Sequence, residues 1–239
     1  MLFGLFKRID HTKKILIIHI AKTAGTSLRR MLEREYGAKH IYPGSFYLKR
    51  FDRGSYPMGS QMLRDYAGFP PHKVLVGHFT AAMADMVPVP YQTATFLREP
   101  IQRSLSMLSH FSHKLHIPVA TLLENEQFMA DNIADFQTRI MGADGVCDPH
   151  AVGTVDDDVL DRALGRLESL DFVGITERFT ESCRRFDSLF ETRISKSIQR
   201  TNVLRPDGTE LTEHIPQIEP LVQRDIILYD AALSRFNAH

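Results

Sequence analysis

Four short apolar runs constrain the fold of this chain more than any other feature. They are continuous rather than alternating, and they cover residues 15–20 (ILIIHI), 73–79 (KVLVGHF), 93–98 (TATFLR) and 172–176 (FVGIT). Continuous apolar strands are buried on both faces, which is typical of a parallel sheet covered by helices. Helix-like stretches follow the first, third and fourth runs. The sequence therefore predicts an α/β fold, a three-layer sandwich with a central parallel sheet.

Signals for helix faces and ends support this interpretation. After the first run, Leu28, Met31 and Leu32 share one helical face, and Gly37 supplies a stop. After the third run, Pro100 suits the first turn of a helix. A strand that alternates in this way with a helix is the usual unit of a three-layer domain.

The length of the chain favours one domain. With 239 residues, 43% of them apolar, the chain can bury one substantial core. We predict a single domain over 1–239, with loop insertions at about 40–72 and 141–158, where glycine, proline and polar residues gather. The sequence leaves the oligomeric state open.

Charge and cysteine content exclude several classes of function. Lysine plus arginine equals aspartate plus glutamate, at 29 each, so the chain lacks the broad positive field of a nucleic-acid-binding surface. Two cysteines, Cys147 and Cys183, are too few for a disulfide framework or a four-cysteine zinc site. No apolar run is long enough for a signal peptide or a membrane span. We expect a cytoplasmic protein with no metal and no nucleic-acid partner.

Small and polar residues follow the first predicted strand directly. The stretch HIAKTAGTSL, residues 19–28, places Lys22, Gly25 and three hydroxyl side chains between that strand and the next helix. Backbone N–H groups of such a turn, together with an ammonium group, can surround a phosphate or sulfate. The stretch is not a Walker A loop, since Ala21 precedes the lysine where that motif has glycine. A structural alternative is a junction whose Thr and Ser only cap the helix.

Two further strand ends carry groups of the same kind. The second run ends in Gly77-His78, where a ligand can approach the backbone and a histidine can exchange a proton. The third run ends at Arg98, with Ser106 two helical turns later, a pair suited to a second anion. The structural alternative for Arg98 is a surface ion pair with Glu99. We interpret His19, which lies inside the first run, as a core residue. Because strand ends of a parallel sheet converge, the three together predict a ligand site.

These motifs resemble those of the carbohydrate sulfotransferases that use 3′-phosphoadenosine 5′-phosphosulfate (PAPS), the group that includes heparan sulfate 2-O-sulfotransferase and many bacterial relatives. HIAKTAGTSL is similar to their 5′-phosphosulfate loop, and FLREPIQRSLS to their 3′-phosphate element. VGHFT is similar to the segment that carries a catalytic-base histidine in the 2-O-sulfotransferase branch, and FVGITERF is similar to a core strand and helix of the family. The chain departs from the pattern at Glu99, where aspartate is more usual, and at Val76, where one branch has a second histidine.

The resemblance implies a P-loop-like fold and a role for each matching residue. Contacts to the 5′-phosphosulfate would come from Lys22, Thr23, Ala24, Gly25, Thr26 and Ser27. Arg98 and Ser106 would hold the 3′-phosphate, and His78 would be the general base. A looser match to the cofactor-closing loop, SKSIQRTNVLRPDG, adds Lys196, Arg200 and Asn202 as cofactor contacts.

The activity implied is in-line transfer of a sulfuryl group from PAPS to a hydroxyl, with adenosine 3′,5′-bisphosphate as product. Lys22 would neutralise charge on the leaving oxygens. The acceptor is expected to contain carbohydrate, as a glycan or glycolipid, or to be a small molecule, and the enzyme to be of the soluble bacterial type. Two alternatives remain open: a nucleotide or small-molecule kinase with a degenerate phosphate loop, and a non-catalytic nucleotide-binding module.

Overall fold

A five-stranded parallel sheet forms the centre of the molecule. The computed structural model describes residues 14–43, 59–60, 63, 72–87, 91–198 and 209–238. The strands are arranged in the order β2-β3-β1-β4-β5, with β1 in the middle. Their bounds are Ile15–Ile18 (β1), Ile41–Tyr42 (β2), Val74–Gly77 (β3), Gln92–Leu97 (β4) and Phe172–Ile175 (β5). All four predicted strands are confirmed, and every neighbouring pair is parallel.

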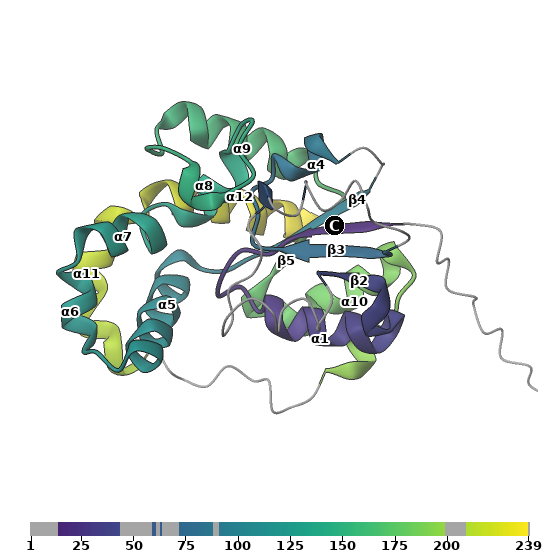
Figure 1. Cartoon of the computed structure of the whole chain (residues 1–239), viewed down its shortest axis with the longest axis horizontal. Helices are drawn as coiled ribbons and strands as arrows, with labels where there is room; N and C mark the ends of the chain where they lie inside the picture. Colours follow the sequence, from purple (N-terminus) through teal and green to yellow (C-terminus); the bar gives the residue numbers. More distant parts are fainter. Residues whose placement is uncertain are drawn as a thin grey trace, which may run out of the picture.

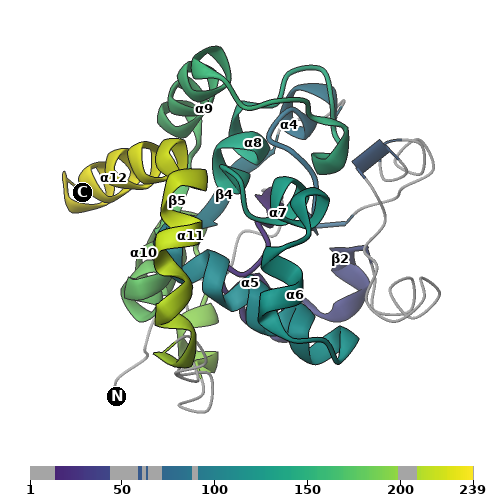
Figure 2. The same ribbon diagram turned by 90° about the vertical axis from the view of Figure 1, so that its left-hand side faces the viewer.

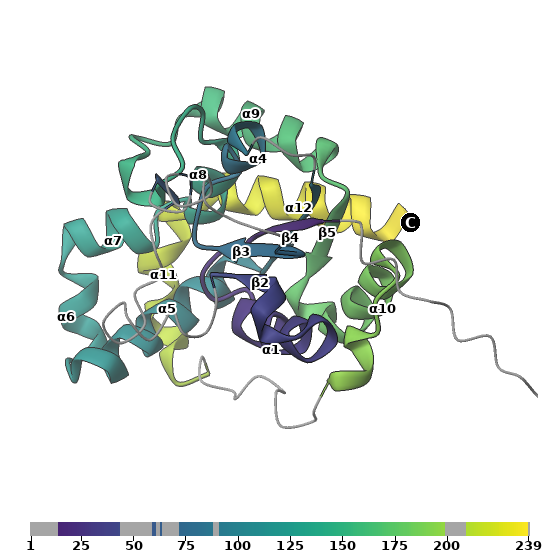
Figure 3. The ribbon, with the colours of Figure 1, turned by 45° about the vertical axis from the view of Figure 1, so that its right-hand side comes forward.

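Helices cover both faces of the sheet, which confirms the three-layer α/β sandwich (Figure 1). On one face lie α1 (Gly25–Tyr36) and α10 (Phe179–Phe190), which pack on the odd-numbered side chains Ile15 and Ile17 of β1. On the other face, Leu16 and Ile18 of β1 pack in one apolar cluster with residues of four helices. These are α8 (Phe136–Gly142), α9 (Asp157–Ser169), α12 (Gln223–Ala238) and the short α4 (Met83–Met86). Figure 3 shows α1 beneath the sheet and α12 above it. With β1 central and a turn leading from it into α1, the arrangement is P-loop-like.

A third group of helices lies beyond the carboxyl ends of the strands (Figure 2). It comprises α5 (Pro100–Leu115), α6 (Val119–Leu123), α7 (Glu126–Asn132) and α11 (Ile215–Ile218). These helices share their own apolar cluster, in which Leu105, Leu108 and Ile218 are fully buried. The group therefore lies opposite the strand ends, and most of the predicted ligand residues that the structure describes line the space between them.

Short 3-10 helices make most of the remaining connections. They are Ala38–His40 (η1), Pro149–Ala151 (η3), Thr176–Arg178 (η4), Ile194–Ser197 (η5), Thr209–His214 (η7) and Glu219–Leu221 (η8). The predicted insertion at about 40–72 lies largely outside the described residues, although its start forms β2. The predicted insertion at 141–158 is irregular except for the end of α8, η3 and the first residues of α9. Across the described residues, no helix is both long and apolar enough to cross a bilayer.

Candidate anion-binding active site

The turn after β1 adopts a conformation that few side-chain-bearing residues accept. Lys22 and Ala24 both have positive φ, at 73° and 65°. A left-handed conformation costs a non-glycine residue about 1–2 kcal/mol. The turn is held from both sides: the Thr23 hydroxyl donates to the Ile20 carbonyl at 2.8 Å, and Nη1 of Arg98 donates to the Lys22 carbonyl at 3.2 Å. Strain that is supported in this way by its surroundings points to a functional turn.

Helix α1 begins directly after this turn with no internal cap. Its N-cap residue, Ala24, makes no side-chain hydrogen bond, and the first turn contains no acidic residue. The first N–H groups of a helix have no partner within the helix and favour negative charge. Gly25 is required here, because a Cβ would lie 1.9 Å from the His19 ring. The ring of His19 therefore forms the floor beneath the start of α1.

The turn after β4 places Arg98 beside this loop. Arg98 is 9% exposed, and its Nε lies 3.9 Å from a carboxylate oxygen of Glu177. Burial lowers the pKa of Arg98, while the carboxylates of Glu177 and Glu99 oppose that shift. Glu99 itself caps α5, because its carboxylate accepts from the backbone N–H groups of Ile101 and Gln102. The arginine thus faces the ligand side of the turn, and the adjacent glutamate serves the helix.

One face of α5 continues the positive side of the site. Ser106, His110 and Lys114 follow one another at intervals of four residues and line the same cavity. Such a spacing places side chains one above another on a helix. Burial lowers the pKa of His110, and the charges of Lys22 and Lys114 lower it further. Lys22 and Lys114 therefore act on the same imidazole from two elements.

Two imidazoles stack where β1 and β3 end. The rings of His19 and His78 have centroids 4.2 Å apart and planes inclined by 29°. Burial is the main cause that lowers the pKa of His78 to about 4; a hydrogen bond to the backbone of His19 opposes the shift, and the nearby His150 adds to it. Burial and the neighbouring cations also hold the pKa of His19 well below its ordinary value. Both imidazoles are neutral at physiological pH, and a neutral imidazole can accept a proton.

The β1–α1 turn, the two stacked imidazoles, Arg98 and one face of α5 open on one cavity of about 890 Å³. Its polar lining combines the β1–α1 turn, His78, Arg98, Ser106, His110 and Lys114 with His150 from η3. Apolar side chains such as Met107, Phe111, Phe136 and Ile140 complete it. None of the described lining residues is an aspartate or a glutamate. In a chain of zero net charge, this local excess of cations favours an anionic ligand.

The predicted site residues fall into three groups. Lys22, Ala24, Gly25, Thr26, Ser27, His78, Arg98 and Ser106 all line the cavity. The Thr23 side chain does not, since it is buried and bonded to Ile20. Lys196 lies in η5, which packs on α1, where Arg34 near the far end of the helix bonds to the Ser197 carbonyl. Lys196 is not among the residues that line the cavity, and Arg200 and Asn202 lie outside the described residues.

The structure also adds residues that the sequence interpretation missed. His19 was predicted to be a core residue, and it is buried, but its ring also lines the cavity. The four-residue spacing that links Ser106 to His110 and Lys114 is visible in the sequence and would have revealed both. His150 carried no local signal, because only the fold brings η3 to the ends of β1 and β3.

Comparisons with known proteins identify no family. No family model matches the chain, and no curated protein matches it. Among solved structures, the crystal structure of a sulfotransferase from Alicyclobacillus acidocaldarius is similar over 89% of this chain and 96% of that one. The TM-score is 0.46 and the sequences are 18% identical. A likeness this distant carries no argument about activity, so function has to be inferred from the side chains of the cavity.

Proposed function

We propose that this chain is a PAPS-dependent sulfotransferase, formed by a single domain, that moves a sulfuryl group to a hydroxyl of a glycan, glycolipid or small molecule. The observation that carries the proposal is the meeting of three features in one cavity: an uncapped helix start with Lys22, a separate cation at Arg98, and the neutral imidazole of His78. Each feature alone has a structural explanation. Their convergence on a space without a described carboxylate favours a ligand with two anionic groups.

The residues present fit this donor. PAPS carries a phosphosulfate on one side of its ribose and a phosphate on the other, and it would supply the sulfuryl group that is transferred. The first turn of α1, with Lys22, Thr26 and Ser27, would hold the phosphosulfate, while Arg98 and Ser106 would hold the 3′-phosphate. A volume of about 890 Å³ lies within the range of small-molecule and cofactor sites, roughly 300–1,000 Å³.

His78 would accept the proton of the acceptor hydroxyl. The new bond joins the acceptor oxygen to sulfur, the bond between sulfur and the bridging phosphate oxygen breaks, and the proton moves to the imidazole. Lys22 would neutralise the charge that grows on the leaving phosphate oxygens. Because burial keeps His78 neutral, the base is ready before the acceptor arrives.

A kinase with a degenerate phosphate loop is the second candidate function. Kinases hold Mg²⁺ through acidic or amide side chains near the transferred group. The described lining of this cavity offers Asn132 but neither aspartate nor glutamate, which favours sulfuryl over phosphoryl transfer. A nucleotide-binding module without catalysis would need the anion sites but not His78.

Transfer of radiolabelled sulfate from PAPS to a pool of bacterial glycans, with a phenol as surrogate acceptor, tests the proposal. We expect turnover by the natural protein and a loss of about 100- to 10,000-fold in His78→Ala, the usual contribution of a positioned proton acceptor. Affinity for adenosine 3′,5′-bisphosphate should stay nearly intact in that variant. Tight binding of the bisphosphate with no transfer by either protein would instead favour the binding module.

A further inference from the structure

Gln137 holds the backbone of Arg98 from both sides. Its side-chain Oε1 accepts from the Arg98 N–H at 3.0 Å, and its Nε2 donates to the Arg98 carbonyl at 2.8 Å. Gln137 is fully buried. Arg98 lies one residue beyond Leu97, the last paired residue of β4, where the strand ladder stops supplying partners. A buried peptide group without a partner is costly, so the amide of Gln137 takes over the role of a neighbouring strand.

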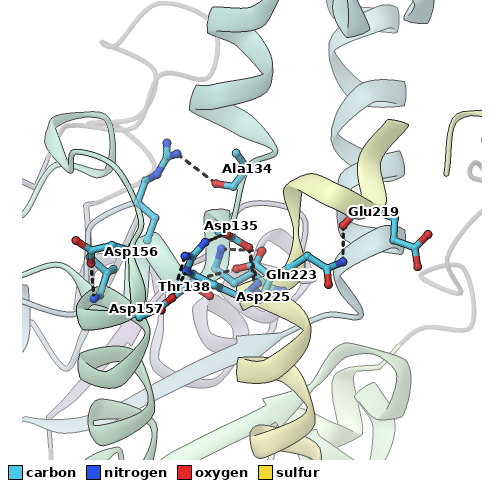
Figure 4. A network of polar contacts seen from close by, with 12 residues as sticks. Ala134, Asp135, Thr138, Asp156, Asp157, Glu219, Gln223 and Asp225 are labelled. Carbon is cyan, nitrogen blue, oxygen red and sulfur yellow. Dashed lines mark hydrogen bonds and ion pairs between the residues drawn. The ribbon is translucent and has the colours of Figure 1, made fainter. Parts of the chain in front are cut away.

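The backbone of the glutamine is itself fixed by one of two reciprocal helix caps, which are formed by Asp225 and Asp135 (Figure 4). Oδ2 of Asp225 accepts from the Gln137 N–H at 3.1 Å and Oδ1 accepts from the Thr138 N–H at 2.7 Å, which caps the start of α8. Asp135 in turn accepts from the N–H groups of Arg224 and Asp225 at 2.9 and 3.1 Å, in the first turn of α12. Each helix start is therefore closed by an aspartate at the start of the other, and Gln137 sits between them.

From these contacts we infer that Gln137 is a positioning residue that sets the place of the Arg98 guanidinium in the anion site. The inference rests on the proposed function, in which Arg98 binds the 3′-phosphate. Arg98 also donates to the Lys22 carbonyl, so the chain of contacts runs from α12 through Gln137 and Arg98 to the β1–α1 turn. Loss of the two hydrogen bonds between the Gln137 side chain and the Arg98 backbone would let the end of β4 shift, and the guanidinium would move with it.

The test measures the affinity of the full chain for adenosine 3′,5′-bisphosphate by calorimetry. Gln137→Met keeps the size and burial of the side chain and removes both hydrogen bonds; we expect affinity to fall about 10-fold. Thr138→Val is the matched control, because Thr138 is equally buried on the same helix and its hydroxyl has no hydrogen-bond partner among the described residues. That variant should bind within about 2-fold of the natural protein.

A double-mutant cycle separates positioning from general damage. If Gln137 acts through Arg98, the Gln137→Met loss should almost disappear in an Arg98→Ala background. An equal loss in both backgrounds, or natural affinity in the single variant, would overturn the inference. Should Gln137→Met fail to fold, Gln137→Glu replaces it in the same cycle, since it keeps the acceptor for the Arg98 N–H and loses the donor. Failure of the natural protein to bind the bisphosphate would refute the proposed function instead.

Discussion

Helices α1 and α5 begin at neighbouring strand ends, yet their first turns are treated in opposite ways. Helix α5 has Pro100 at its first position and Glu99 as its cap, whose carboxylate accepts two backbone N–H groups. Helix α1 has neither: its cap position is Ala24, with positive φ and no side-chain hydrogen bond. An alanine at this position is among the poorest caps. The end that lacks an internal anion is the one that opens on the cavity.

The two helix starts differ in whether the chain itself supplies the negative charge at the first turn. At α5 the chain supplies its own carboxylate, and the helix is complete without a ligand. At α1 the chain supplies no carboxylate in the first turn, and under the proposed function the positive end of the helix dipole, Lys22 and the strained turn bind an anionic ligand. Helices α8 and α12 follow the first pattern, because Asp225 and Asp135 close them. Changes that exchange the two patterns test this difference.

The largest effect is expected when α1 receives a carboxylate of its own. Thr26 is an exposed residue in the first turn, so Thr26→Glu should fold and gain about 0.3–1 kcal/mol from the helix dipole. Because the new charge competes with the ligand, affinity for adenosine 3′,5′-bisphosphate should fall about 100-fold. Thr26→Gln, of the same size but neutral, should lose far less. Calorimetry on both proteins checks this; equal losses would show that size rather than charge is responsible.

A smaller loss is expected when the second cation is removed. Arg98→Ala should weaken adenosine 3′,5′-bisphosphate about 10-fold or more, since charged hydrogen bonds contribute about 1.5–3 kcal/mol. Adenosine 5′-phosphate should be weakened less, through loss of the Arg98 contact to the Lys22 carbonyl alone. Titration of both nucleotides measures the difference. Identical losses would mean that Arg98 supports the turn and binds no 3′-phosphate.

The pH dependence of turnover reports the protonation of His78, and the shift in its pKa on binding measures the negative charge of the ligand. His78 in the free protein has a pKa lowered to about 4, chiefly by burial, with His150, the His19 backbone and the stacked His19 ring facing it. The acid limb of kcat/KM should therefore lie near pH 4, and neutral His78 persists above it. Bound anions favour the imidazolium, so the limb of kcat should lie at higher pH. Coincident limbs near pH 6.5 would contradict the burial of this base.

The same lowered pKa affects stability. Unfolded histidine binds its proton near pH 6.5, whereas folded His78 stays neutral down to about pH 4. Between these values the unfolded state binds more protons, so the contribution of His78 to stability is complete above about pH 6.5 and declines as the pH falls to about 4. His19 should act in the same direction. Asp225 opposes them, because burial raises its pKa to about 6. Urea unfolding of the natural protein and His78→Ala across this range isolates the His78 share.

The smallest effect concerns the closed helix start. Glu99→Ala removes two hydrogen bonds at the first turn of α5 and should cost about 1 kcal/mol of unfolding free energy. Nucleotide affinity should change little, because this carboxylate is not among the lining residues of the cavity. Thermal unfolding and calorimetry on one preparation measure both quantities. A variant of unchanged stability that loses the nucleotide would reverse the roles assigned to the two turns.

Local sequence signals predicted the sheet and the place of the turn after β1, because both depend on short continuous patterns. Strands β1, β3 and β5 are apolar at nearly every position, whereas β4 also contains Gln92, Thr93 and Thr95. Strand β2, Ile41–Tyr42, escaped prediction because two residues carry no periodicity. Helix α9 has the cap Asp156, whose carboxylate accepts from the Val159 N–H, but its start falls within the segment interpreted as a loop.

Features of the site that depend on distant segments could not be predicted. In the sequence, Gln137 has no feature that distinguishes it from other helical residues. Its two hydrogen bonds to the Arg98 backbone exist only because α8 packs near the end of β4. Asp225 and Asp135 are separated by 90 residues, so neither cap could be inferred from spacing. His19 was placed correctly in the interior, but its stacking on His78 and its contact with Gly25 require the tertiary fold.

The most direct test of the open helix start is a calorimetric titration of the natural protein with adenosine 3′,5′-bisphosphate, adenosine 5′-phosphate and ATP with magnesium. A cavity with an anion site at the start of α1 and a second cation at Arg98 should bind the bisphosphate at least about 10-fold more tightly than the monophosphate, because one further charged contact forms. ATP with magnesium should bind more weakly than the bisphosphate. Binding of ATP with magnesium as tightly as the bisphosphate, or no preference for the 3′-phosphate, would contradict the account.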